Sequence, residues 1–243
     1  MKRVHVNIQN DSNIQNDQNV ILALIEVSDQ IKHSIIDINK ELDMTNPVNR
    51  LVTQVRVKNI FENCRSALDY MAYLIVKTYK IPIKDENIYF PICDSEKYFE
   101  ERKLIKYLKN KNDMLYRILK KIQPFYNNNN DDIYNWLCIF NKINNKYKHR
   151  GFIFLHAKFS TFGGGWISMS PNMSCQRFTL KLQDEIGAVK EVTTDLRNDK
   201  NIEFQFCFEN GTDLIPFLDK VIKGTYSIIK EIWYNGPKAE ETQ

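Results

Sequence analysis

Apolar residues recur at three- and four-residue steps along most of the chain, which is the spacing of amphipathic helices. One such pattern covers residues 20–42, and a longer one runs without a helix breaker from Val48 to about Lys80. Asn46-Pro47 precedes the longer pattern as a capping residue followed by a proline at the first helical position. Further patterns predict helices over residues 94–110, 114–122 and 133–150. The chain up to Arg150 therefore predicts a helical bundle.

After Arg150 the pattern changes to that of β-strands. Residues 151–159 are apolar and aromatic, and apolar residues alternate with polar ones over residues 178–182 and 202–208. A last helical pattern follows Thr212 or Asp213 and ends near Asn235-Gly-Pro237. The expected fold class is α+β: a helical bundle, then three to five antiparallel strands in a small sheet, and a C-terminal helix.

The chain ends look different from its middle. A polar repeat, Asn7-Ile-Gln-Asn-Asp11 and Asn13-Ile-Gln-Asn-Asp17, predicts a flexible tail over residues 1–18 because such segments bury little. The expected organisation is this tail, a helical bundle carrying the site at 19–150, strands and C-terminal helix on the same core at 151–236, and a loose tail at 237–243.

Composition adds mainly exclusions. The chain has 243 residues, 43% hydrophobic and 26% charged, with a formal charge of +4, which is ordinary for a globular protein and too mild to indicate nucleic acid. Its five cysteines show no CxxC spacing and its four histidines form no HxxxH pair, so we expect neither metal nor cofactor. No apolar run approaches the ~20 residues that cross a bilayer, and no signal-peptide core follows Met1, so a cytoplasmic protein without membrane contact is expected.

Two polar sets lie beside apolar helical faces. Arg65 and Asp69 stand one turn apart within the long pattern, and Asn141-Lys-Ile-Asn-Asn-Lys-Tyr-Lys-His-Arg150 ends the helix before the strands. Because both sets lie at the rim of a buried stripe, two packed helices would bring them together. The cluster would then comprise Arg65, Asp69, Asn141, Asn145, Lys148 and His149, with Asn144 and Arg150 next to it.

A structural interpretation of each set stays open. Arg65 and Asp69 at i,i+4 would also make an ordinary surface ion pair. Lys148-His149-Arg150 would also suit a solvated helix C-terminus, where cations complement the helix dipole. Asn144-Asn145 is harder to explain in this way, because asparagine disfavours the middle of a helix.

Four segments carry a resemblance to a group of uncharacterised bacterial proteins with RSALDH, FPI, LQPY and NNxDKHR elements. Here they read Arg65-Ser-Ala-Leu-Asp69, Phe90-Pro-Ile92, Ile122-Gln-Pro-Phe125 and Asn144-Asn-x-x-Lys-His-Arg150, in the same order and spacing. The resemblance spans about Asn46 to Arg150. Two departures are Tyr70 and Tyr147, which stand where that group has a histidine and an aspartate.

That group resembles the HEPN superfamily of helical proteins, many of which are metal-independent ribonucleases of toxin–antitoxin and anti-phage defence systems. The resemblance implies a homodimeric endoribonuclease that acts on RNA, with an antitoxin or defence-complex protein as a further partner. Its expected catalytic residues are Arg65, Asp69, Asn145, Lys148, His149 and Arg150, with Asn141 and Asn144 binding substrate.

Residue chemistry suits that assignment. A histidine transfers protons near neutral pH, and arginine holds a phosphate in a bidentate manner. Tyr70 and Tyr147 favour a second interpretation, in which a non-catalytic HEPN-like module binds a nucleotide or a protein. A third is a structural subunit of a defence complex, in which the polar cluster only stabilises the fold.

Overall fold

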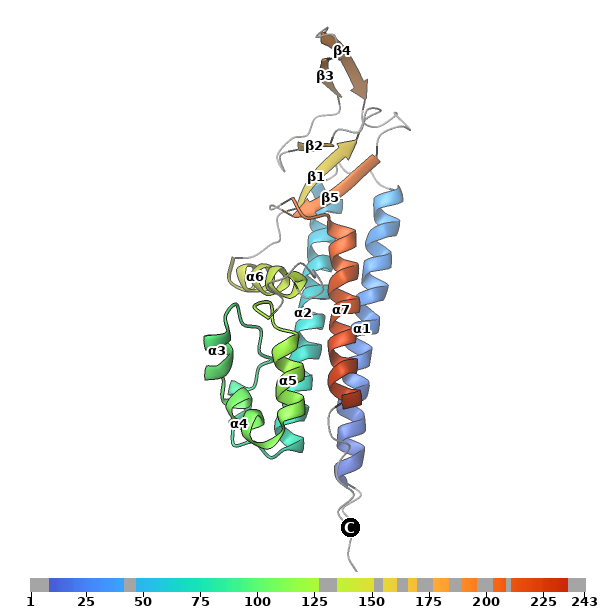
Figure 1. Cartoon of the computed structure of the whole chain (residues 1–243). Coiled ribbons are helices and arrows are strands. Elements are labelled where there is room, and N and C mark those ends of the chain that lie inside the picture. Colours follow the sequence, from blue (N-terminus) through green and yellow to red (C-terminus); the bar gives the residue numbers. More distant parts are fainter. Residues whose placement is uncertain are drawn as a thin grey trace, which may run out of the picture. The chain divides into compact units, whose positions relative to one another are not determined.

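Seven α-helices dominate the part of the chain that the computed structural model describes (Figure 1). The described residues are 9–41, 47–126, 135–150 and 211–235, together with five strands between 155 and 208. Within them, the side chains of residues 9–15, 38–41, 47, 50 and 147–150, and of the strands other than Cys207 and Phe208, lie outside the description.

The helices follow the periodicity of the sequence closely, and the predicted helical bundle is confirmed. They are α1 (Gln9–Glu41), α2 (Pro47–Thr78), α3 (Glu96–Glu101), α4 (Lys103–Lys111), α5 (Asp113–Lys121), α6 (Asn135–Arg150) and α7 (Leu214–Asn235), with one 3-10 turn, η1 (Asp85–Asn87).

Two helix boundaries differ from the prediction. Helix α1 begins at Gln9, within the polar repeat, because neither glycine nor proline interrupts residues 9–18. The helix expected over residues 94–110 is divided at Arg102, whose ψ of 131° is extended. No helix breaker marks Arg102, so periodicity alone does not reveal the division.

The chain divides into two compact units. The first comprises Met1–Ile31, Lys58–Gly151 and Leu218–Gln243, and the second comprises Lys32–Val57 and Phe152–Phe217. The C-terminal helix therefore belongs mostly with the helical unit, and the strands form the other unit with the ends of α1 and α2.

Three helices meet in the core of the first unit. The thiol of Cys64 on α2 lies beside the hydroxyls of Ser28 on α1 and Thr225 on α7, and all three residues are fully buried. On the next face of α2, Phe61 meets Phe140 of α6 edge to face at 5.5 Å. These contacts fix α6 against α2, the two helices that carry the predicted polar sets.

Gly224 permits a close approach between α7 and α6. A Cβ at this position would lie 2.5 Å from Cε2 of Trp136, closer than real carbon atoms pack. The buried Trp136 ring thus lies directly on the α7 backbone.

The second unit contains two antiparallel ladders. Its strands are β1 (Leu155–Ser160), β2 (Trp166–Met169), β3 (Arg177–Gln183), β4 (Val189–Asp195) and β5 (Glu203–Phe208). They pair in the order β2-β1-β5 and, separately, β3-β4. Because the side chains of β1–β4 lie outside the described residues, one small sheet packed on the helical core remains a prediction.

A tight turn leads from β5 into α7. Phe208 donates from its N–H to the carbonyl of Thr212 at 2.9 Å and accepts from Gly211 N–H at 2.8 Å, with Gly211 at φ 81°. None of the helices in the described ranges has the length and apolar character that a membrane span requires.

Candidate functional site

Arg65 and Asp69 form a close ion pair on α2. Nε of Arg65 donates to Oδ2 of Asp69 at 3.1 Å, and Nη2 lies 3.0 Å from Oδ1. The side chains are only 13% and 25% exposed. This pair therefore differs from the solvated surface pair that the i,i+4 spacing also allowed.

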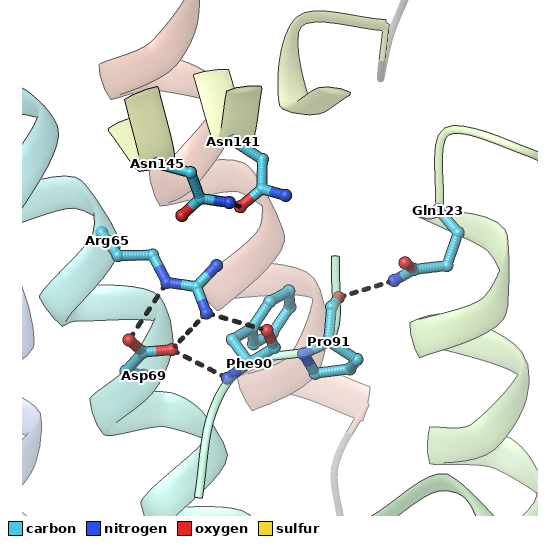
Figure 2. A network of polar contacts seen from close by, with 7 residues as sticks. All are labelled: Arg65, Asp69, Phe90, Pro91, Gln123, Asn141 and Asn145. Carbon is cyan, nitrogen blue, oxygen red and sulfur yellow. Dashed lines mark hydrogen bonds and ion pairs between the residues drawn. The ribbon is translucent and has the colours of Figure 1, made fainter. Parts of the chain in front are cut away.

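The same pair holds the backbone of Phe90. Asp69 Oδ1 accepts the Phe90 N–H at 2.8 Å, and Arg65 Nη2 donates to the Phe90 carbonyl at 3.2 Å (Figure 2). Phe90 is buried, and its polar backbone groups need partners that no neighbouring strand provides. Arg65 and Asp69 supply both partners from one helical turn.

Gln123 completes this arrangement from the end of α5. It is fully buried, donates from Nε2 to the carbonyls of Pro91 at 3.0 Å and Leu119 at 2.9 Å, and accepts the Cys93 N–H at 2.9 Å. We refer to Arg65, Asp69 and Gln123 as the clamp. The clamp fixes the extended segment 88–93 between α2 and α5.

A pocket of about 610 Å³ opens beside the clamp. Arg65, Asn141 and Asn145 contribute to one part of its wall, and Phe90 and Pro91 lie beneath them. The rest of the lining includes Asn87, Tyr89, Glu101, Arg102 and Lys103. Arg65 is already paired with Asp69, and Arg102 and Lys103 stand against the single carboxylate of Glu101, so a small excess of positive charge favours an anionic ligand.

Arg65 keeps one nitrogen for this pocket. Its Nη1 makes no hydrogen bond within the described part of the chain, whereas Nε and Nη2 are engaged by the clamp. Figure 2 shows the amides of Asn141 and Asn145 above the guanidinium, linked to each other by a long 3.5 Å hydrogen bond. An amide pair and one free guanidinium nitrogen can together hold a phosphate.

Of the predicted site residues, Arg65, Asn141 and Asn145 share one pocket wall. Asp69 is engaged by the clamp and does not line the pocket. Asn144 is 4% exposed and also does not line it; its Nδ2 finds no hydrogen-bond partner in the described ranges. Lys148, His149 and Arg150 continue the helical backbone of α6, but their side chains lie outside the described residues.

A second pocket, of about 580 Å³, has a thiol in its wall. Cys138 Sγ donates to Asp94 Oδ1 at 3.3 Å, and Lys142 lies beside it. Burial, with a further contribution from Asp94, raises the pKa of Cys138, so this thiol is protonated at neutral pH. No cluster of three metal-ligating side chains occurs among the described residues.

The sequence patterns predict no role for Gln123, although it lies within one of the four segments that carry the resemblance. The indication lay in Phe90-Pro-Ile92: an extended apolar segment between helices must bury backbone groups without a strand partner. A polar residue inside the neighbouring motif Ile122-Gln-Pro-Phe125 was the candidate partner.

Comparison with known proteins adds no relative from which function can be transferred. No family model matches the sequence, and neither the curated proteins nor the solved structures give a match.

Proposed function

We propose that the chain is a HEPN-like, metal-independent endoribonuclease whose active site is the pocket beside the clamp. The observation that carries the proposal is the convergence of Arg65 Nη1 with the amides of Asn141 and Asn145 on one wall. These groups come from two helices, α2 and α6, as the two polar sets of the sequence require.

Arg65 and the two amides bind the scissile phosphate in this proposal. RNA cleavage without metal needs donors for the charge that develops on the phosphate oxygens. The clamp holds the guanidinium in place before substrate arrives, which lowers the cost of ordering it. Asp69 acts as a positioning residue, because it fixes Arg65 and does not line the pocket.

His149 supplies the proton transfer in this proposal. Its backbone position on α6 is one helical turn beyond Asn145, and residues at this spacing share a helix face. An imidazole there would take the 2′-hydroxyl proton or protonate the leaving 5′-oxygen. Lys148 and Arg150 would add positive charge at the same end of the helix.

A non-catalytic nucleotide-binding module is the second candidate. It is favoured by the clamp itself, since Asp69 and Nη2 of Arg65 hold the Phe90 backbone and Nε of Arg65 donates to Asp69. In this case the pocket binds a phosphorylated ligand without chemistry, and Arg65 is retained for folding.

Cleavage of a labelled RNA in the presence of EDTA tests the proposal. We expect Asn145→Ala to lower the cleavage rate at least tenfold, and His149→Ala to lower it by roughly 10²–10⁴, the usual contribution of general acid–base catalysis. The matched controls are Asn59→Ala and His33→Ala, which remove an exposed helical asparagine and histidine outside the pocket and should leave the rate unchanged.

Each outcome distinguishes the candidates. Folded wild-type protein that binds RNA without cutting it would establish the non-catalytic module. Protein that neither binds nor cuts RNA would remove both. Cleavage by His149→Ala at the wild-type rate would show that another group moves the proton.

A further inference from the structure

The pocket beside the clamp is long as well as polar. Arg65 and Val76 both line it, and they are eleven positions apart on α2, a distance of about 16 Å along the helix axis. Arg65 and the two asparagines contribute to this lining from α2 and α6, while Arg102 and Lys103 contribute from the junction of α3 and α4. This length exceeds what one phosphate group occupies.

An exposed aromatic residue contributes to the lining of the same pocket. In the extended segment 88–93, successive side chains point to opposite sides. Phe90 and its neighbour Tyr89 both contribute to the lining, but Phe90 is 2% exposed whereas Tyr89 is 62% exposed. Arg65 and Asp69 hold the backbone of Phe90, so the backbone of Tyr89 is held beside the pocket as well.

We infer, resting on the proposed function, that Tyr89 stacks on one unpaired base of the RNA and that Arg102 with Lys103 binds a backbone phosphate beyond the one at Arg65. An aromatic face combined with cations is the usual arrangement for unpaired nucleic acid, because every base presents a π face. Asp69 balances Arg65, and Glu101 balances only one of Arg102 and Lys103, so the pocket keeps an excess of positive charge.

A duplex does not suit this wall. Paired bases are stacked on one another and present only their edges, sugars and phosphates, so none is available to the ring of Tyr89. Tyr89 would then contribute nothing to binding, and the phosphate contacts alone would remain. Selection for unpaired RNA thus depends on one side chain that can be replaced without disturbing the core.

Binding of a labelled oligonucleotide, measured by fluorescence anisotropy at fixed salt, tests this inference. We expect Tyr89→Ala to weaken binding of an unpaired RNA by roughly 5- to 150-fold, the range reported for loss of one base–aromatic stack. Tyr89→Phe keeps the ring and should bind nearly as wild type. The matched control is Tyr98→Ala, because Tyr98 is equally exposed at 62% but lies outside the pocket.

A second pair of variants tests the contribution of the cationic residues of the pocket. Lys103→Ala should weaken binding and reduce the slope of log affinity against log salt by about one phosphate contact. Lys106→Ala, an exposed lysine on the same helix outside the pocket, should change neither.

Failure of the inference is separable from failure of the proposed function. If Asn145→Ala weakens RNA binding while Tyr89→Ala behaves as Tyr98→Ala, the pocket binds RNA but the stacking assignment is overturned. Equal affinity for a duplex of the same sequence would also overturn it. If wild-type protein neither binds nor cleaves RNA, the proposed function is wrong and this inference is wrong as well.

Discussion

Arg65 divides its guanidinium between the fold and the pocket. Nε and Nη2 face Asp69 and the Phe90 carbonyl, and Nη1 remains beside Asn141 and Asn145. Because a guanidinium is planar, fixing two of its nitrogens also fixes the third. One residue thus links the backbone of an extended segment to the geometry of the candidate site.

Replacing Asp69 by alanine should destabilise the protein by about 2–4 kcal/mol, because a mostly buried guanidinium loses its counter-charge and the Phe90 N–H loses its acceptor. The control is Glu62→Ala, which removes the i,i+4 pair between Lys58 and Glu62 on the same helix, with side chains 40% and 43% exposed. That change should cost less than about 0.5 kcal/mol in urea denaturation. Equal losses in the two variants would show that the clamp contributes no more than a surface pair.

Thiol reactivity should follow the environment of each cysteine. Burial raises the pKa of Cys64 to about 12, so alkylation of native protein at pH 8 should leave it unmodified. The pKa of Cys138 is raised by burial and also by Asp94, so Asp94→Asn should speed its alkylation, whereas Lys142→Ala should slow it. Mass spectrometry over time measures both; equal rates in the two variants would contradict the assigned environment.

Helices are where sequence and structure agree best. The apolar periodicity of α5 and α7 is strong, and α2 begins at Pro47 and runs without a helix breaker, so the positions of these helices follow from local chemistry. The early start of α1 does not, because a polar, asparagine-rich repeat carries no apolar stripe to mark it, and the division at Arg102 does not, because no helix breaker stands there.

The candidate site was predictable only in part for a similar reason. Rim positions on two helices correctly placed Arg65 with Asn141 and Asn145, since helical geometry sets them. The burial of Asn144 and the role of Gln123 depend on which element packs above each residue, and a single sequence does not contain that information.

Packing of α7 on α6 should be sensitive to one methyl group. Gly224→Ala improves helix propensity by about 1 kcal/mol, yet the added Cβ would overlap the Trp136 ring, so we expect a net loss of about 1–3 kcal/mol. Lys223→Ala, at an exposed neighbouring position, should change stability by less than about 0.5 kcal/mol. Adding Trp136→Phe should recover part of the loss in a double-mutant cycle; strictly additive effects would exclude the contact.

Glu100 joins three short helices and should make their stability depend on pH. Burial alone would raise its pKa, but hydrogen bonds from Tyr116 on α5 and Lys109 on α4 outweigh burial and lower the pKa below that of an ordinary glutamate. A carboxyl with a lowered pKa stabilises the fold above the pKa of its unfolded state, and this stabilisation is lost as pH falls through the folded value. Glu100→Gln should therefore cost about 1 kcal/mol at pH 7 and less at pH 3.5, unlike the exposed control Glu86→Gln. A difference in the free energy of unfolding between wild type and Glu100→Gln that does not change with pH would contradict the assigned role.

At the scale of the whole molecule, the core of the helical unit is complete only when the C-terminal helix α7 packs against it. Its core takes Leu218, Val221 and Ile229 from α7, which follow the strands of the other unit in sequence. The cost of closing so long a loop is recovered only when α7 packs.

A fragment of residues 1–151 should therefore fail to unfold cooperatively, because Trp136 and Cys64 lose the helix that covers them. A peptide covering residues 214–235 added in trans should restore the near-ultraviolet circular dichroism of the aromatic core. A Gly224→Ala peptide should restore it less well. Cooperative melting of the fragment alone would show that α7 is dispensable for the core.

The double use of Arg65 has a consequence for tracing descent. An inactive chain would still need this guanidinium to hold its Phe90 segment. Folding alone is therefore enough to preserve the arginine, the aspartate and the proline-containing stretch through evolution. Persistence of these three motifs among distant sequences is consequently no measure of retained chemistry. The outward-facing Asn145, which the fold does not need, is the position whose variation would report it.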